Sequence, residues 1–224
     1  MIIIKSPYEI EKMGRSGKIT AKILRKILEV IKPGITTKEL DKFAFSLFKK
    51  EKVKPAFLNY NGFPASICTS VNEIVVHGIP NDYSLKDGDI VSIDLGVEYD
   101  GYFGDMTATV GCGNISDKAK RLIEVTKQSL YEGINMARSD NHLYDISAAI
   151  QEYVEKNGFS VVRDLVGHGI GQRLHEDPQI PNFGHYGRGP ILKDGMVFAL
   201  EPMVTEGRFE VAMLDDGWTV VTKD

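Results

Sequence analysis

Residues 90–110, IVSIDLGVEYDGYFGDMTATV, decide how this chain folds. Two runs rich in β-branched and aromatic residues flank the dipeptide Asp100-Gly101. That dipeptide favours a two-residue hairpin turn, because both turn positions need a positive φ angle. The stretch is therefore predicted to be an antiparallel hairpin in which Tyr99 faces Tyr102.

Each arm of this hairpin carries one carboxylate, Asp94 in the first arm and Asp105 in the second. The predicted register places Asp94 opposite Thr107, and Asp105 two residues further along the same face. Because side chains alternate between faces, the two aspartates are diagonal neighbours, roughly 7 Å apart at the backbone. Buried carboxylates this close repel each other unless a cation lies between them. The hairpin alone leaves two interpretations open: a site for one or two divalent metal ions, or two solvent-facing aspartates on an antiparallel edge.

The composition is typical of a soluble globular protein. Hydrophobic residues make up 42% of the 224 residues and charged residues 26%, which excludes disordered and fibrous classes. A net charge of −4 gives no electrostatic case for a nucleic-acid site or a membrane surface. The start of the chain is too polar for a signal peptide, and no apolar run is long enough for a membrane span. Cys68 and Cys112 lack CxxC spacing and indicate reduced thiols, so we expect a cytoplasmic protein, monomeric by default.

Helix signals precede the hairpin. Apolar residues at helical spacing predict a helix over 7–31, before the breaker Pro33-Gly34. A capping box that starts at Thr36 predicts a second helix, which runs to about residue 52. Short strands are expected near 66–70 and 73–76.

The chain after the hairpin repeats this order. Ser116 is predicted to cap a helix that ends near residue 137, and Asp140 to cap one that ends at Asn157-Gly158. Strands are predicted over 159–165 and within 211–222.

A glycine-rich break at 167–171 and a proline-containing loop at 177–190 separate these last strands. The faint repeat predicts a duplicated architecture with halves of about 7–110 and 116–224. No linker separates the halves, so we expect residues 1–224 to form a single catalytic domain with its cleft between them.

His168 and Glu201 are the chemically suggestive residues of the second half. His168 lies in GHGIG, where three glycines within five residues allow the backbone to approach a site closely. Glu201 ends an apolar run, so its carboxylate is expected to be buried and to need a partner. Each residue alone is more often structural than functional. Together with the two aspartates they fit divalent ions such as Mn, Fe(II), Co or Zn, or two ions that share Asp105 and hold a bridging hydroxide.

The motifs SIDLG, GDMT, GHGIG, HEDP, EPM and DGWTV, in this order, resemble those of type I methionine aminopeptidases. NYNGFP and SVNEIVVHGIP strengthen the resemblance, which runs from about Ser6 to the last residue. It implies an α+β pita-bread fold, in which pseudo-twofold duplicated helices cover a curved antiparallel sheet with a central cleft for two metal ions. The implied activity is hydrolytic removal of the initiator methionine from nascent proteins whose second residue is small.

The resemblance also implies roles for the metal-site residues. Asp94 would bind one ion, Asp105 would bridge both ions, and His168 and Glu201 would bind the other. Glu201 would also be catalytic, relaying a proton to the leaving amine.

Two further histidines gain roles from the same resemblance. His77 and His175 would flank the scissile peptide, and His175 would hydrogen-bond the carbonyl oxygen or the tetrahedral intermediate. The pocket for the methionine side chain would be lined by Tyr60, Phe63, Cys68, His77 and Trp218, and His175 would also bind the substrate.

The chain departs from the family pattern at a few positions. Phe57 and Leu174 stand where relatives commonly have a smaller residue and a phenylalanine, which alters the pocket shape. Ser139-Asp140 replaces a usual Pro-Gly and should affect only a helix entry. Relatives carry a further bridging glutamate shortly after the stretch that resembles GWTVVTKD, whereas this sequence ends at Asp224. We therefore expect either a fragment that lacks the last strand, or a naturally short protein whose second metal site is weak.

Two rival functions stay open. A proline-specific aminopeptidase or prolidase uses similar ligands, but the chain lacks the extra N-terminal domain of those enzymes. A non-catalytic pita-bread protein that has lost its metals would carry no stoichiometric ion. The expected partners are nascent N-termini, with transient ribosome contact through diffusion or weak binding. Because Ile2 is large, the chain is expected to retain its own Met1.

Overall fold

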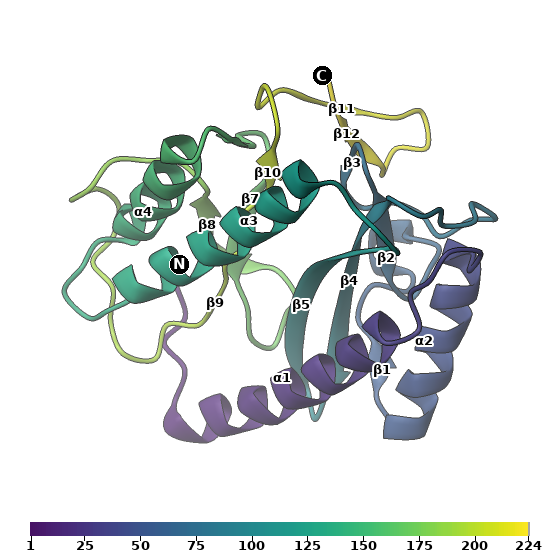
Figure 1. The fold of residues 1–224 in the computed structure, drawn as a ribbon. Coiled ribbons are helices and arrows are strands. Elements are labelled where there is room, and N and C mark those ends of the chain that lie inside the picture. Colours follow the sequence, from purple (N-terminus) through teal and green to yellow (C-terminus); the bar gives the residue numbers. More distant parts are fainter. Residues whose placement is uncertain (224) are drawn as a thin grey trace.

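The computed structural model describes residues 1–223. Within that range, four α-helices accompany two ten-residue strands and several short ones, and every strand pair is antiparallel (Figure 1). No helix in that range is both long enough and apolar enough to cross a membrane. The helices are α1 (Pro7–Leu28), α2 (Thr37–Glu51), α3 (Asp117–Met136) and α4 (Leu143–Lys156).

The predicted hairpin is confirmed in its turn and in its register. It consists of β4 (Ile90–Tyr99) and β5 (Tyr102–Gly111), paired along their full lengths. The turn residues Asp100 and Gly101 have φ angles of 50° and 78°, as a two-residue hairpin turn requires. Tyr99 pairs with Tyr102, Asp94 with Thr107, and Gly96 with Asp105, so the two aspartates are diagonal neighbours on one face.

Helix α1 packs on this hairpin, which β1 (Lys54–Pro55) and β2 (Cys68–Val71) extend by pairing with β4, and α2 packs against α1 and β1 (Figure 1). The Ser16 hydroxyl of α1 donates a hydrogen bond to the Val97 carbonyl oxygen at 3.1 Å. The helix can lie this close to the hairpin because Gly104 has no Cβ atom. A Cβ atom there would lie 2.6 Å from Thr20 Oγ1. The buried residues of this core are mainly aliphatic and include Ile23, Leu24, Ile27, Leu40, Phe48, Ile67, Val91, Ile93, Leu95 and Val97.

The second half has its own core, beneath α3 and α4. Strand β6 (Ser160–Val161) pairs with β10 (Val204–Thr205). Strand β7 (Val166–Gly169) lies between β8 (Glu176–Pro181) and β9 (Phe198–Ala199). The buried residues of this core are Val125, Leu143, Ile146, Ile150, Val154, Phe159, Val161, Ile180 and Leu192.

A fourth sheet joins residues from the two halves of the chain. Strand β12 (Val220–Thr222) lies between β11 (Val211–Met213) and β3 (Ile74–Val76). The predicted strands within 211–222 are confirmed, with the turn at Asp215 to Gly217 between them. This sheet brings Trp218 close to His77, which follows β3.

Two predicted helix boundaries were wrong. Helix α1 ends at Leu28 and not at residue 31, because the next turn tightens: the N–H groups of Val30 and Ile31 bond to the carbonyls three residues earlier. The N-cap of α4 is His142 and not Asp140. The backbone N–H of His142 donates to Asp145 Oδ2 at 2.8 Å, which stabilises the helix start.

The predicted strands and loops of 159–190 also needed correction. Only Ser160 and Val161 of the predicted strand pair with a neighbour, because β10 offers two partner residues. The glycine-rich break instead forms most of β7, and the proline-containing loop begins as β8. Strand extent here depends on the available partner, which local composition does not reveal.

Candidate metal centre

Three side chains from the two halves converge at one point. Asp105 comes from β5, His168 from β7, and Glu201 lies two residues after β9. One ligand atom from each lies within 4.8 Å of the others. His168 Nε2 is 3.0 Å from Glu201 Oε1 and 3.6 Å from Asp105 Oδ2. The hairpin and the second half thus share a single cluster of nitrogen and oxygen donors.

Asp94 lies outside this three-residue group but interacts with it. Burial raises the pKa of its carboxyl well above the ordinary value, and the charges of Asp105 and Glu201 raise it further. A hydrogen bond with Thr107 opposes this rise. The carboxylates are therefore close enough to repel, as the hairpin register predicted.

His168 is oriented for its Nε2 atom to face the carboxylates. Its Nδ1 lies 2.8 Å from the Gly169 carbonyl oxygen, which can only accept, so Nδ1 carries a hydrogen. Burial alone lowers the pKa of His168, but Asp105 and Glu201 outweigh this and raise it to about 10. A carbonyl that fixes the ring in this way is common around metal-binding histidines.

The donor set fits a divalent cation. Glu201 Oε1 is buried and accepts no hydrogen bond from any residue of 1–223, although His168 Nε2 is 3.0 Å away. A buried acceptor without a donor is unfavourable unless another group satisfies it. One imidazole and carboxylate oxygens are ligands that Zn, Mn, Co and Fe(II) accept.

Glycines allow β7 to lie unusually close to both of its neighbours. A Cβ atom at Gly167 would lie 2.4 Å from the Ala199 carbonyl oxygen of β9. A Cβ at Gly169 would lie 2.0 Å from the Asp177 carbonyl oxygen of β8. The glycines beside His168 are therefore required by the close approach of neighbouring strands, whereas the sequence analysis expected them to allow close approach to a site.

Glu201 is held through its backbone by a residue that sequence reasoning missed. Asn182 Nδ2 donates to the Glu201 carbonyl oxygen at 2.8 Å, and Asn182 is only 1% exposed. A buried amide needs such a partner. Asn182 follows β8, within the segment predicted to be a loop, and no periodic signal marks it as buried.

His175 stands beside the cluster and contacts two residues of the predicted site. Its Nδ1 is 2.6 Å from the Tyr60 hydroxyl, and its ring centroid is 4.2 Å from that of His168. Burial lowers the pKa of His175, as do the nearby His168 and His77. Tyr60 belongs to a single 3-10 turn, Tyr60–Gly62.

The other predicted pocket residues are brought together in one region. Phe63 and Cys68 are buried in an apolar cluster that Tyr60 and Trp218 border, and the Phe63 and Trp218 rings are 5.2 Å apart. The His77 ring lies 6.4 Å from Trp218. Phe57 and Leu174, the two positions at which the sequence departs from the family pattern near the pocket, belong to the same cluster.

Cys68 links this apolar cluster to the acidic hairpin. It pairs with Asp94 across β2 and β4. Burial raises the pKa of its thiol, and the charges of Asp94 and Asp105 raise it further. Cys68 is therefore a neutral, apolar member of this cluster rather than a thiolate.

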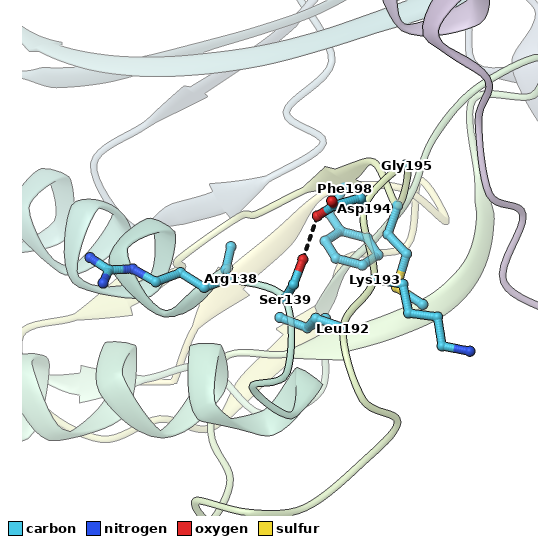
Figure 2. A pocket seen from close by; sticks show the side chains of 9 residues that line it. Arg138, Ser139, Leu192, Lys193, Asp194, Gly195 and Phe198 are labelled. Atoms are coloured by element: carbon cyan, nitrogen blue, oxygen red, sulfur yellow. Dashed lines mark hydrogen bonds between the residues drawn. The ribbon is translucent and has the colours of Figure 1, made fainter.

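A hollow outside this region lies between the end of α3 and residues 192–198. Its lining includes Ser139, whose hydroxyl donates to the Asp194 carboxylate, while Arg138 and Lys193 extend away from it (Figure 2). The hollow therefore offers no converging set of ionisable groups like the one at Asp105.

Comparison with known proteins agrees with this geometry. Residues 11–222 match metallopeptidase family M24. The chain is 55% identical over 224 residues to a methionine aminopeptidase of Clostridium perfringens and 54% identical to methionine aminopeptidase 1 of Bacillus subtilis. It covers 90% of each of these relatives, and they cover 100% of it.

Solved structures share the fold. The methionine aminopeptidase of Thermotoga maritima superimposes with a TM-score of 0.98 at 48% identity, covering 100% of this chain, which in turn covers 90% of that structure. A prolidase from Pyrococcus furiosus is more distant, with a TM-score of 0.77 at 26% identity over 89% of this chain and 57% of its own. The fold is thus the α+β pita-bread fold that the sequence predicted. The chain belongs to metallopeptidase family M24 and, within it, to the methionine aminopeptidases.

Proposed function

We propose that this chain removes N-terminal methionine from polypeptides by metal-assisted hydrolysis. The observation that carries the proposal is the convergence of Asp105, His168 and Glu201 around an unsatisfied buried carboxylate oxygen. It occurs in a chain that is more than half identical to proteins named methionine aminopeptidases.

Two divalent ions would be held by residues from both halves. Asp105, His168 and Glu201 would bind one ion, and Asp94 with Asp105 the other. Bound Co, Mn, Fe(II) or Zn would polarise the peptide carbonyl and lower the pKa of a water molecule. The raised pKa of Asp94 supports this assignment, because a carboxylate pair that repels in the free protein is stabilised by a cation.

His175 would stabilise the developing negative charge on the carbonyl oxygen. Its lowered pKa keeps the ring neutral near pH 7, with one N–H. When the Tyr60 hydroxyl donates a hydrogen bond to Nδ1 of His175, the one ring hydrogen of His175 is on Nε2. Nε2 can then donate a hydrogen bond to the substrate. Removal of a comparable donor typically slows an enzyme by about 10²–10³-fold.

Glu201 would move the proton. Burial raises the pKa of this carboxyl, while the close His168 ring opposes the rise. A carboxyl with a raised pKa can take a proton from water and pass it to the leaving amine. We expect His77 to contact the peptide on the opposite side of the site.

The apolar cluster would hold the methionine side chain. Aromatic rings of Tyr60, Phe63 and Trp218 suit a flexible thioether, since sulfur makes favourable contacts with ring edges. The neutral Cys68 and the ring of His77 complete the wall. The substrate's free amine would lie on the Asp94 side, which restricts cleavage to the first residue.

Hydrolysis of three peptides tests the proposal. With added Mn or Co, the chain should cleave Met-Ala-Ser and leave Leu-Ala-Ser and an Ala-Pro peptide intact. Cleavage of the Ala-Pro peptide instead would favour the proline-specific rival. Absence of both turnover and a stoichiometric metal ion would favour the non-catalytic rival.

We further propose that residues 1–224 act as one catalytic unit in the cytoplasm, on nascent chains near the ribosome. A small second residue in the substrate would be required. The large Ile2 should therefore protect the chain's own Met1. N-terminal sequencing of the native protein should find Met1, and a sequence that began at Ile2 would contradict this rule.

A further inference from the structure

A buried ion pair ties the start of the chain to the segment that carries His175. Lys5 Nζ lies 2.6 Å from Glu176 Oε2, and the two side chains are only 3% and 2% exposed. Lys5 precedes α1, while Glu176 directly follows His175 and begins β8. The pair joins residues that are 171 positions apart in the chain.

The Glu176 carboxylate also closes the loop before it. Its Oε1 atom accepts a hydrogen bond from the backbone N–H of Arg173 at 3.1 Å. A Cβ atom at Gly171 would lie 2.6 Å from Lys5 Cε and 2.8 Å from Glu176 Oε1. The third glycine of GHGIG therefore leaves room for the ion pair.

Other contacts hold residues 1–5, which we call the N-terminal strap, against the same region. The Lys5 backbone N–H donates to the Gly195 carbonyl oxygen at 2.7 Å. The Met1 ammonium group forms an ion pair with Asp177. The strap thus contacts Gly195, which precedes Glu201 in the chain, and the two residues that follow His175.

Burial alternates along the segment that contains His175. As whole residues, Leu174 is 2% exposed and Glu176 is 8% exposed. His175 between them is exposed, and its ring contacts the Tyr60 hydroxyl. Leu174 is held by the apolar cluster, but Glu176 is held by Lys5. Two buried neighbours therefore determine where the His175 side chain is presented.

Stability alone is a poor explanation for this ion pair. Two charges lose much hydration on burial, and well-packed apolar residues would often be as stable. A charge pair does, however, restrict the groups that it joins to one geometry. Burial tends to raise the pKa of Glu176, but Lys5 and the Arg173 N–H lower it below the ordinary value, so the carboxylate stays charged.

We infer that Lys5 is a positioning residue for His175, acting through Glu176. The inference rests on the role proposed for His175 in the reaction. The strap carries no group that reaches the metal ligands, so its loss should misplace His175 and leave metal binding intact. Nothing in the sequence motifs predicted a role for Lys5.

The variant Lys5→Met tests this assignment. Displacement of a catalytic group by about 1 Å can slow turnover by about 10²-fold, so kcat for Met-Ala-Ser should fall by roughly that factor. KM and Mn affinity should stay close to the wild-type values. Lys38→Met is the matched control, because it breaks an exposed pair with Asp82 and should leave kcat unchanged.

A double-variant cycle separates positioning from a general effect on the fold. In a His175→Ala background, Lys5→Met should lower kcat no further, because the group that Lys5 positions is absent. Full multiplication of the two losses would overturn the inference. So would a wild-type kcat in Lys5→Met.

A second variant and a second readout keep the test decisive. If Lys5→Met fails to fold, Lys5→Met/Glu176→Gln removes both charges and should still show the loss of kcat. Hydrogen exchange of amides in 171–177 should be faster in either variant, with Mn affinity preserved. This readout needs no turnover, so an inactive wild-type chain would count against the proposed function alone. Unchanged exchange would count against the strap.

Discussion

Asp94 and Asp105 stand on two ten-residue strands that are paired along their full lengths. His168 and Glu201 come from a different kind of structure. His168 is in a four-residue strand, and Glu201 follows a two-residue strand. We call the hairpin, residues 90–111, the floor of the metal site, because it is one continuous pair of strands. We call residues 166–201 of the second half the wall of the metal site, because several short strands and loops form it.

The difference shows what fixes the positions of the ligand residues in the floor and in the wall. Regular backbone hydrogen bonds place the floor, so its geometry survives changes of side chain. The wall depends on individual contacts: glycines that allow close approach, the Asn182 amide on Glu201, and the His168 ring on a carbonyl. Substitutions in the floor should change the chemistry and preserve the fold, while substitutions in the wall should disturb both.

The largest effect is expected from Asp105→Asn in the floor. The change keeps the side-chain shape but removes the charge that both proposed ions share. Turnover should fall by about 10³-fold, since metal polarisation supplies several kcal/mol. The metal-free protein should melt close to the wild-type temperature, because relief of the repulsion with Asp94 offsets the lost attraction to protonated His168. Glu98→Gln, which breaks an exposed pair on the other strand of the hairpin, is the control. Retention of full Mn binding in Asp105→Asn would refute the shared-ligand role.

Gly169→Ala should produce the next largest effect, in the wall. The added Cβ would meet the Asp177 carbonyl oxygen at 2.0 Å, so β7 and β8 must separate. We expect a loss of about 3 kcal/mol in the free energy of unfolding, and a melting temperature lower by about 6–12 °C. Calorimetry measures both. The control is Gly14→Ala in α1, where nothing lies within 4 Å and alanine should stabilise the helix by about 1 kcal/mol. Equal melting temperatures for both variants would show that the wall does not depend on the close approach of β7 and β8 at Gly169.

Asn182→Ala should have an intermediate effect confined to metal binding. Without the amide, the backbone of Glu201 is free to shift, and the affinity for Mn should fall by about 10–100-fold. Titration calorimetry gives the affinity. Asn157→Ala removes a similar amide-to-carbonyl bond at the end of α4 and should leave the affinity unchanged. An equal loss in both variants would show that Asn182 acts on general stability.

The smallest expected effect is the release of protons when a metal ion binds. Because the pKa of His168 is raised to about 10, the ring is protonated at pH 7 and must lose that proton to bind a metal. Metal binding at pH 7 should release at least about one proton, and affinity should rise with pH until it passes the pKa of His168. Calorimetry in buffers of different ionisation enthalpy measures the release. Metal binding that is independent of pH between 6 and 9 would contradict this role for His168.

The sequence predicted the floor better than the wall, for a physical reason. Hairpin register follows from the Asp100-Gly101 turn and from period-two alternation, which are local properties. Helix starts at Thr36 and Ser116 were likewise predicted from capping residues. The cap at Asp140 failed because His142 and Asp145 supply the same hydrogen bond further along.

Contacts between distant segments escaped the sequence analysis. The roles of Asn182 and Lys5 depend on partners 19 and 171 positions away, and nothing in their own neighbourhoods announces those partners. The strand that contains His168 was taken for a break because glycine is rare in strands. Only the close neighbours on both sides explain why glycine is needed there.

The central claim is that floor and wall together hold metal ions at Asp105. Anomalous diffraction from crystals of this chain soaked in Mn²⁺ tests it most directly. We predict a peak within roughly 2.0–2.3 Å of His168 Nε2 and of carboxylate oxygens of Asp105 and Glu201, with a second, weaker peak between Asp94 and Asp105. A map with no peak at these residues, or with Mn²⁺ bound elsewhere on the chain, would contradict the account.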